Sequence, residues 1–440
     1  MLLEFRISNF KSFVDEMTFS LVPAPKQKGL DYSVLQERVG SKAYKGLCSA
    51  VIYGPNASGK TNIVGAMEVF KLIILRGHIR NESNKNSPNT AADTLELIPN
   101  SSQEKKTPVF FAIKFIEQGV LFEYQIKLDL GLFLKSTYKR KILSEVLFVN
   151  EKKIFERDDI LKLDEISTVK KYLNKGLAGN LSSAVSLAEG SLNGEELFLV
   201  NGFKNIFSAE LASMIASWMD TKFLPIYRAD TIHHAKLFSE PQRQSVHIEE
   251  SINSAAKLFG ISSNDLGYIV QENEVEGKLS SLFKHKDSGI AIPAEIYESY
   301  GTIRFINLFP IILTTLLQGG TLIVDEFDAS IHPMALMSII NIFHNDAINT
   351  RNAQLIFNTH NPIFLNSNLY RRDEIKFVER DEATQGSSLY SLSDFGTSGE
   401  KAARKHDDYM KKYFISQYGA IKDIDFTPIF ESLVLADEVK

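Results

Sequence analysis

The chain has 440 residues, of which 44% are hydrophobic and 23% are charged, a balance typical of a globular protein with a large core and two or three structural units. Its net charge of −5 excludes an overall electrostatic attraction to nucleic acid, although it leaves room for a local basic face. The single cysteine, Cys48, excludes an internal disulfide bond, and we expect it to be a buried structural thiol.

The beginning of the chain does not resemble a targeting segment. Glu4 and Arg6 stand where a signal peptide would need an apolar stretch. The longest apolar-rich stretch, residues 306–317, is too short to span a bilayer. Because a single cysteine also agrees with a reducing compartment, these features predict a cytoplasmic protein with no membrane partner.

The first elements in chain order are two strands and a helix. Residues 2–10 predict an edge strand, and residues 14–46, with prolines and several charges, predict irregular structure. Residues 47–53 form a short apolar run typical of a buried parallel strand. From residue 60 to about residue 76, apolar residues recur at helical spacing, which predicts a helix.

Residues 54–61, GPNASGKT, connect this strand to this helix and form a phosphate-binding loop of the type Gly-x4-Gly-Lys-Thr. Its glycines allow backbone N–H groups to approach phosphate oxygens, and Lys60 adds a catalytic positive charge for the β and γ phosphates. Thr61 offers a hydroxyl to Mg²⁺. The loop therefore predicts an ATP and Mg²⁺ site, with nucleotide contacts from Gly54, Asn56, Ala57, Ser58, Gly59, Lys60, Thr61 and Asn62.

The middle of the chain changes character twice. A polar excursion at residues 77–106 is followed by alternating apolar patterns that predict an antiparallel meander, with strands at residues 109–116, 122–128 and 142–149. Residues 157–285 predict helices broken by Gly, Ser and Asn loops, with one strand at 223–227. From about residue 290 an α/β pattern returns, with helices near 302–317, 333–348 and 400–417 and strands near 321–324, 354–357, 375–378 and 389–392.

Polar residues follow two of these late strands. Asp325 and Glu326 come directly after the apolar run 321–324, at the strand end where parallel sheets place ligand groups. Asp325 suits a Mg²⁺ role, and Glu326 suits the orientation of an attacking water. His360 follows the strand 354–357 and can hydrogen-bond a γ phosphate, with a capping or surface role as the alternative.

Lys60 and Asp325 are 265 positions apart, yet both must contact one Mg²⁺–nucleotide. A compact P-loop domain needs far fewer intervening residues, so the spacing predicts an insertion between two halves of one head. We therefore expect an α/β fold with an N-terminal half at residues 1–156, a helical insertion at 157–289 and a C-terminal half at 290–440.

These motifs resemble the ABC-type ATPase heads of the SMC, RecF and OLD (overcoming lysogenisation defect) families. Residues 7–13 are similar to the first strand of such heads, and residues 325–330, which include Asp328, resemble their Walker B motif and D-loop. His360 matches their switch histidine. Residues 298–302, ESYGT, stand where their signature motif lies and keep Ser299 and Gly301 without the full LSGGQ sequence.

The resemblance covers about residues 1–150 and 290–400, and is closest to stand-alone bacterial ATPases of the RloA and abortive-infection kind. It implies a head with a mixed β-sheet lobe and an antiparallel β subdomain. It also implies a homodimer or higher oligomer in which two heads enclose two ATP molecules. Ser299 and Gly301 of one copy would then cover the γ phosphate held by the other, and ATP hydrolysis would release the pair.

OLD proteins also carry a nuclease module with clustered carboxylates, and no such cluster follows His360, so we expect no nuclease activity. The hypothesis favoured is a switch that senses infection and controls a separately encoded effector, a nuclease or toxin, in an anti-phage system. The alternative is a DNA repair or replication ATPase like RecF that binds DNA directly, with the basic segment 135–141 as the place to test. A transporter ATPase is a third, weaker hypothesis.

Overall fold

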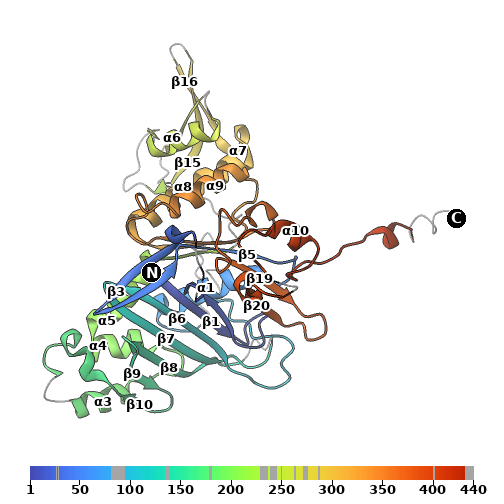
Figure 1. Ribbon diagram of the computed structural model, residues 1–440. Coiled ribbons are helices and arrows are strands. Elements are labelled where there is room, and N and C mark those ends of the chain that lie inside the picture. The colour runs from blue at the N-terminus through green and yellow to red at the C-terminus, as the bar shows by residue number, and fades with distance from the viewer. Residues whose placement is uncertain are drawn as a thin grey trace, which may run out of the picture.

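The computed structural model describes residues 1–431 apart from 26, 28, 81–94, 134–137, 178–180, 228–235, 238–244, 249, 262–263, 271–275, 286–287 and 400–401. The described strands build a seven-stranded, a six-stranded and a five-stranded sheet, with helices between and beside them (Figure 1). The helices are α1 (Lys60–Arg76), α3 (Leu181–Gly190), α4 (Lys204–Ile206), α5 (Ala209–Thr221), α6 (Glu250–Phe259), α7 (Ala294–Tyr297), α8 (Tyr300–Gln318), α9 (Pro333–Phe343) and α10 (Tyr409–Phe414).

The six-stranded sheet is the one that carries the predicted nucleotide motifs. Its order is β11-β17-β18-β5-β19-β20, in which the first five strands are parallel and β20 is antiparallel to β19. The strands of this sheet are β5 (Ser49–Tyr53), β11 (Phe223–Ile226), β17 (Thr321–Val324), β18 (Gln354–Asn358), β19 (Ile375–Arg380) and β20 (Ser387–Ser391). Two strands far apart in sequence, β5 and β18, are thus direct neighbours.

The seven-stranded sheet is antiparallel throughout, in the order β10-β9-β8-β7-β6-β1-β2. Its strands are β1 (Leu2–Ser8), β2 (Met17–Ser20), β6 (Val109–Glu117), β7 (Val120–Asp129), β8 (Lys141–Val149), β9 (Lys152–Arg157) and β10 (Leu161–Leu163). The predicted meander is confirmed as β6, β7 and β8. A separate hairpin consists of β3 (Val34–Val39) and β4 (Lys42–Leu47).

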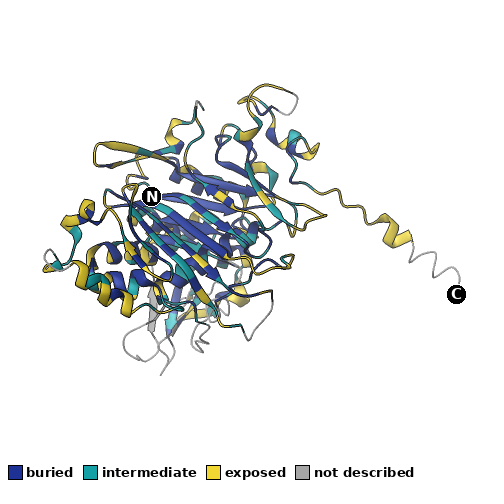
Figure 2. Ribbon diagram, turned by 90° about the horizontal axis from the view of Figure 1, so that it is seen from below, coloured by how far each residue is buried: buried dark blue, intermediate teal, exposed yellow. Residues whose placement is uncertain are grey.

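Helix α1 lies between the antiparallel and the parallel sheet and joins their cores. The ring of Phe70 stacks on Phe111 of β6 at 5.7 Å and meets Phe5 of β1 edge-on at 5.9 Å. Ala50 and Ile52 of β5 belong to the same buried cluster. This face of β5 therefore packs on α1, and the buried residues run along the packed strands in Figure 2.

The opposite face of the parallel sheet packs under α8 and α9. Val51 and Tyr53 of β5 alternate with Ala50 and Ile52 and join a second cluster with residues of both helices, such as Leu308. Because both faces are covered, the strands are almost wholly apolar, which is why their short runs are visible in the sequence.

The predicted α/β class of a P-loop head is confirmed, but three predictions about its parts are wrong. The strand predicted at residues 2–10 is not an edge, because β1 is paired on both sides. Residues 14–46 contain β2 and the β3–β4 hairpin rather than only irregular structure. The helix predicted for residues 400–417 is reduced to α10 among the described residues.

The insertion expected to be helical at residues 157–289 is mixed. Helices α3 to α5 pack beside the antiparallel sheet, whereas β11 joins the edge of the parallel sheet, where its Pro225 needs no ladder partner. A five-stranded antiparallel sheet follows, with α6 beside it (Figure 1). Its strands are β12 (Lys236–Leu237), β13 (Ser245–Ile248), β14 (Asp265–Val270), β15 (Glu276–His285) and β16 (Ser288–Pro293). Short runs between Gly and Ser residues fit a helix or a strand equally well, so the sequence did not separate them.

Candidate nucleotide site

The phosphate-binding loop connects β5 to α1, as the sequence predicts. Gly59 has a φ of +111°, a conformation that side chains rarely adopt. A Cβ at Gly59 would come within 2.6 Å of Ser12 Oγ and 2.7 Å of Ser387 Oγ, and one at Gly54 within 2.3 Å of the Val378 carbonyl oxygen. Gly54 and Gly59 are therefore required, because side chains at these positions would collide with Ser12 after β1 and with residues of β19 and β20.

Lys60 begins α1, and its ammonium group folds back over the loop. Its Nζ donates to the carbonyl oxygens of Gly54 at 2.7 Å and Pro55 at 3.0 Å. Burial lowers the pKa of Lys60 to about 8, against the opposing effect of Asp325 and Glu326. The Ser58 hydroxyl is buried without a hydrogen-bond partner among the described residues. A phosphate group would satisfy both, so the residues present fit this ligand.

The two distant halves of the chain meet at Thr61 and Asp325. Thr61 Oγ1 donates to Asp325 Oδ1 at 3.0 Å, although the residues are 264 positions apart. Asp325 is buried, and the Nδ2 of Asn358 donates to the same Oδ1. A hydroxyl and a carboxylate held together are oxygen ligands that suit Mg²⁺.

Glu326 turns away from Asp325 because its backbone adopts a left-handed conformation, with a φ of +50°. Its backbone N–H donates to Asn358 Oδ1, and its carbonyl oxygen accepts from Arg304 of α8 at 2.5 Å. Arg304 is buried, so this contact joins α8 to the end of β17. The side chain of Glu326 is exposed and faces the cavity over the loop.

His360 lies on the other side of the same cavity. Partial burial, and then the positive charge of Lys60, lower the pKa of His360, while Asp328 and Asp325 oppose the shift. At pH 7 the imidazole is therefore mostly neutral, with one N–H available to donate. Asp328, in the predicted D-loop, is close enough to act on it electrostatically but does not line the cavity.

The cavity over the loop has a volume of about 260 Å³. It is lined by Asn56, Ala57, Ser58, Gly59, Lys60, Thr61, Asn62, Glu326, Asn358, His360 and Arg380. A larger cavity of about 960 Å³ shares Asn56, Ala57, Ser58 and Arg380 with it and extends along the turn between β19 and β20. The two cavities thus lie side by side along residues 56–58 of the loop.

The predicted signature residues lie elsewhere. Ser299 caps α8, its Oγ accepting from the Thr302 backbone N–H at 3.1 Å. Gly301 is pressed against the predicted D-loop, since a Cβ there would come within 2.0 Å of the Ser330 carbonyl oxygen. Neither Ser299 nor Gly301 lines the cavity over the loop. The structure thus joins signature and D-loop to each other but not to the phosphate end of this chain's own site.

Sequence reasoning missed Asn358, Arg304 and Arg380 as parts of the site. Asn358 stands at a strand end two residues before His360, which was a usable signal. Arg304 lies within an apolar helix and Arg380 at the end of an edge hairpin, so nothing local distinguishes either. Their roles depend on which strand lies beside which.

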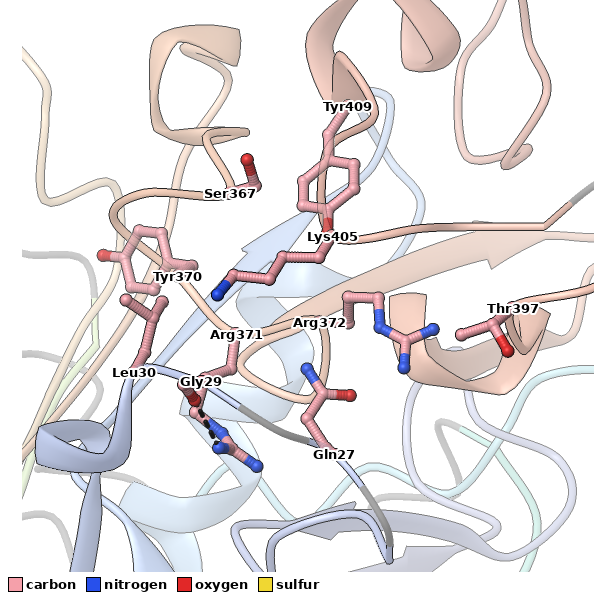
Figure 3. Close-up of a pocket in the computed structure, with 10 residues that line it drawn as sticks. All are labelled: Gln27, Gly29, Leu30, Ser367, Tyr370, Arg371, Arg372, Thr397, Lys405 and Tyr409. Atoms are coloured by element: carbon pink, nitrogen blue, oxygen red, sulfur yellow. Dashed lines mark hydrogen bonds between the residues drawn. The ribbon is translucent and has the colours of Figure 1, made fainter.

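A separate cavity of about 240 Å³ lies away from the loop and has a basic lining (Figure 3). Arg371 forms a bidentate ion pair with Asp373, and Arg372 donates to the carbonyl oxygens of Gly396 and Ala403. Lys405 extends across the cavity (Figure 3). None of the residues predicted from the sequence lines it.

Among the described helices, α8 alone has the length and apolar composition of a membrane span. Half of that stretch is buried inside the protein. Phe305, Leu308 and Ile312 belong to the core cluster over the parallel sheet, which accounts for the apolar character of the helix.

Comparison with known proteins adds the family. No curated protein matches the chain. A solved SMC head domain from Thermotoga maritima is similar, with 12% identity, 89% of this chain and 98% of that chain covered, and a TM-score of 0.36. The model of the family described as "AAA domain, putative AbiEii toxin, Type IV TA system" matches residues 49–366, from β5 through the loop, Asp325 and His360. The chain belongs to this family of AAA-type ATPase domains.

Proposed function

We propose that this protein is an ATPase switch in which two copies close around two Mg²⁺–ATP molecules and thereby control a separate effector. The observation that carries the proposal is the contact between Thr61 and Asp325 beside Lys60, Glu326 and His360. The phosphate loop with Thr61, the Glu326 carboxylate and the neutral His360 imidazole line one cavity, and the buried Asp325 carboxylate lies directly behind Thr61. ATP hydrolysis is the reaction that uses all of them.

The backbone of the loop and the Lys60 ammonium bind the β and γ phosphates, since Lys60 can exchange its two carbonyl partners for phosphate oxygens. Thr61 and Asp325 would hold Mg²⁺, which neutralises charge on the phosphate oxygens. Asn358 keeps Asp325 in place for this role.

Glu326 accepts a hydrogen bond from the attacking water and orients it toward the γ phosphate. Asn358 accepts from the backbone N–H of Glu326, and Arg304 donates to its carbonyl oxygen. These two bonds fix the backbone from which the Glu326 carboxylate extends. His360 donates its ring N–H to the γ phosphate. Because its pKa is lowered, it does so as a neutral group.

The second copy supplies the missing side of the site. Ser299 and Gly301 lie outside the cavity of their own chain, next to Ser330 of the D-loop. If they cover a γ phosphate, that phosphate is bound by a partner copy. Helix α8 has 19 residues, and the positive end of its dipole, at its N-terminus, would then face the phosphate of the partner copy. ATP acts as the adhesive between the heads, and hydrolysis separates them.

Replacing Glu326 by Gln tests this directly. We expect ATP hydrolysis about 100-fold slower or more, because a water-orienting carboxylate is lost. Light scattering should show a stable dimer of this variant only when Mg²⁺–ATP is present. Glu165→Gln, at an exposed position outside the site, is the matched control and should behave as the wild type. If Glu326→Gln hydrolyses ATP at the wild-type rate, Glu326 does not orient the attacking water. If the variant stays monomeric at saturating ATP, the proposed ATP-bound dimer is wrong.

The description of the family, which names a putative toxin of a type IV toxin–antitoxin system, supports a role in defence, and we infer control of a separate effector from the resemblance to RloA-type and OLD-type heads. We expect expression of this chain alone to leave growth unaffected and a protein encoded next to it to co-purify with it. Growth arrest or phage resistance from this chain alone would instead make it the toxin itself.

Among the described residues, no observation favours direct DNA binding as in RecF. Within the described part of the basic segment 135–141, Arg140 donates to the Ile79 carbonyl oxygen and Lys141 pairs with Asp159. DNA-stimulated hydrolysis that weakens steeply with salt would support this alternative.

A further inference from the structure

A cluster of three metal-ligand side chains lies at the opposite end of the parallel strands from the loop. Cys48 precedes β5, His344 follows α9 and Glu374 precedes β19, and all three are buried. One ligand atom from each lies within 4.8 Å of the other two. We propose that these residues bind a structural Zn²⁺ ion.

The distances suit this ion. Glu374 Oε1 is 4.0 Å from Cys48 Sγ and 3.3 Å from His344 Nε2. In a tetrahedral zinc site the corresponding ligand–ligand distances are about 3.4–3.6 Å, given the usual zinc bond lengths. The Ser49 hydroxyl, 2.9 Å from Nε2 and 2.7 Å from Oε1, offers a fourth donor. The remaining pair, Cys48 Sγ and the His344 ring nitrogen, lies within 4.8 Å, so side-chain shifts on the order of an ångström bring the donors around one point.

The protein by itself leaves this cluster incompletely satisfied. Two buried polar atoms have no hydrogen-bond partner among the described residues: His344 Nδ1 and the Tyr370 hydroxyl. Ser33 is next to Cys48, with its carbonyl oxygen 2.9 Å from the Cys48 N, and Tyr370 meets the His344 ring edge-on at 5.9 Å. Buried polar atoms without partners are one sign that an ion or water completes a polar cluster.

Charge and donor chemistry select zinc. A thiolate, a carboxylate and a neutral imidazole carry two negative charges, which a divalent ion cancels within the buried cluster. A mixed sulfur, nitrogen and oxygen set favours Zn²⁺ over Mg²⁺ or Ca²⁺. The bound ion would link the segments before β5, after α9 and before β19. Two of these segments lead directly into strands of the parallel sheet that carries the phosphate loop.

The single cysteine makes the test unambiguous, because any metal–thiolate signal can come only from Cys48. The full chain, purified without a histidine tag, should contain close to one equivalent of zinc by mass spectrometry. Protein from cobalt-grown cells should show thiolate-to-cobalt charge-transfer absorption. Cys48→Ser should lose the zinc, whereas His406→Ala, which removes an exposed histidine outside the cluster, should keep it.

Two results would overturn the proposal: wild-type protein that is folded but free of zinc, or cobalt-loaded protein without the sulfur band. The cluster would then be a hydrogen-bonded His–Glu pair with Ser49. If Cys48→Ser fails to fold, the metal content and cobalt spectrum of the wild type decide alone. Neither readout depends on ATP hydrolysis, so the zinc site and the proposed switch can fail independently.

Discussion

The polar residues at the two ends of the parallel strands differ in their exposure. At the carboxyl end, Asp325 and Glu326 after β17 and Asn358 at the end of β18 meet the phosphate loop after β5, and Glu326 and Asn358 line a cavity. At the amino end, Gln354 of β18 is fully buried and all its bonds stay inside the protein. Its amide contacts Leu2, Thr321 and the carbonyl of Leu47.

This difference assigns a separate task to each end. The buried end holds together the N-terminal strand, β17 and β18, so it contributes stability. The open end contains Lys60 folded back over the loop, a Ser58 hydroxyl without a hydrogen-bond partner among the described residues, and glycines in close contact with their neighbours. These features lower local stability and leave groups available for a ligand. Substitutions at the two ends should therefore affect different measurements.

Gln354→Leu should have the largest effect, on stability alone. It leaves the backbone groups of Leu2 and Leu47 without their buried partner, which we expect to cost about 3 kcal/mol in the free energy of unfolding. Denaturant titration measures this loss. Under conditions in which Gln354→Leu stays folded, it should bind ATP with wild-type affinity. A large loss of ATP affinity would contradict the separate roles of the two strand ends.

Lys60→Ala should have the reverse effect. Removing a charged donor to phosphate should weaken ATP binding about 30-fold to 150-fold, measured by calorimetry. The free energy of unfolding without nucleotide should change little, since the partners of the ammonium among the described residues are two carbonyls of its own loop. An unchanged ATP affinity would show that the loop does not bind phosphate through this residue.

Asn358→Ala should act on hydrolysis more than on binding. Asn358 contacts Asp325 and the backbone of Glu326 but is a positioning residue for both, so we expect kcat to fall about tenfold to 100-fold with a smaller change in KM. Asn361→Ala, three residues further on, is the control. Equal losses in kcat and in ATP affinity would indicate that Asn358 touches the nucleotide itself.

The smallest expected effect is on pH dependence. The pKa of Lys60 is about 8 in the free protein, and ATP prefers its charged form. Affinity should therefore be constant below pH 8 and fall by up to tenfold per pH unit above it, until the higher pKa of the bound lysine is reached. Lys60→Arg should remove this fall, because arginine stays charged. A flat profile for the wild type would contradict the lowered pKa.

The open end was largely predictable and the buried end was not. The phosphate loop and the Asp325–Glu326 pair follow local patterns with fixed spacing, so the sequence alone locates them. Asn358 gains its role from strand register: Val324 of β17 pairs with Phe357 of β18, which puts Asp325 beside Asn358. Gln354 and the cluster around Cys48 likewise depend on neighbours that are hundreds of positions away. The burial predicted for Cys48 is confirmed, but its partners had no signal in the chain.

The insertion was the least predictable region. Within its β12–β16 sheet, β15 (EGKLSSLFKH) and β16 (SGIAIP) contain Gly and Ser, and their apolar residues do not alternate strictly. Such strands are specified by pairing with one another rather than by a pattern within each. The domain boundaries at residues 156 and 289 remain a prediction.

The central claim is that two distant halves of the chain hold one Mg²⁺–ATP, and a double-mutant cycle tests it most directly. ATP affinity would be measured with Mg²⁺ and with chelator for the wild type, Thr61→Val, Asp325→Asn and the double variant. The account predicts that each single variant loses most of the gain in affinity due to Mg²⁺ and that the double variant loses no more than either. Full retention of that gain in Asp325→Asn, or losses that simply add, would contradict it.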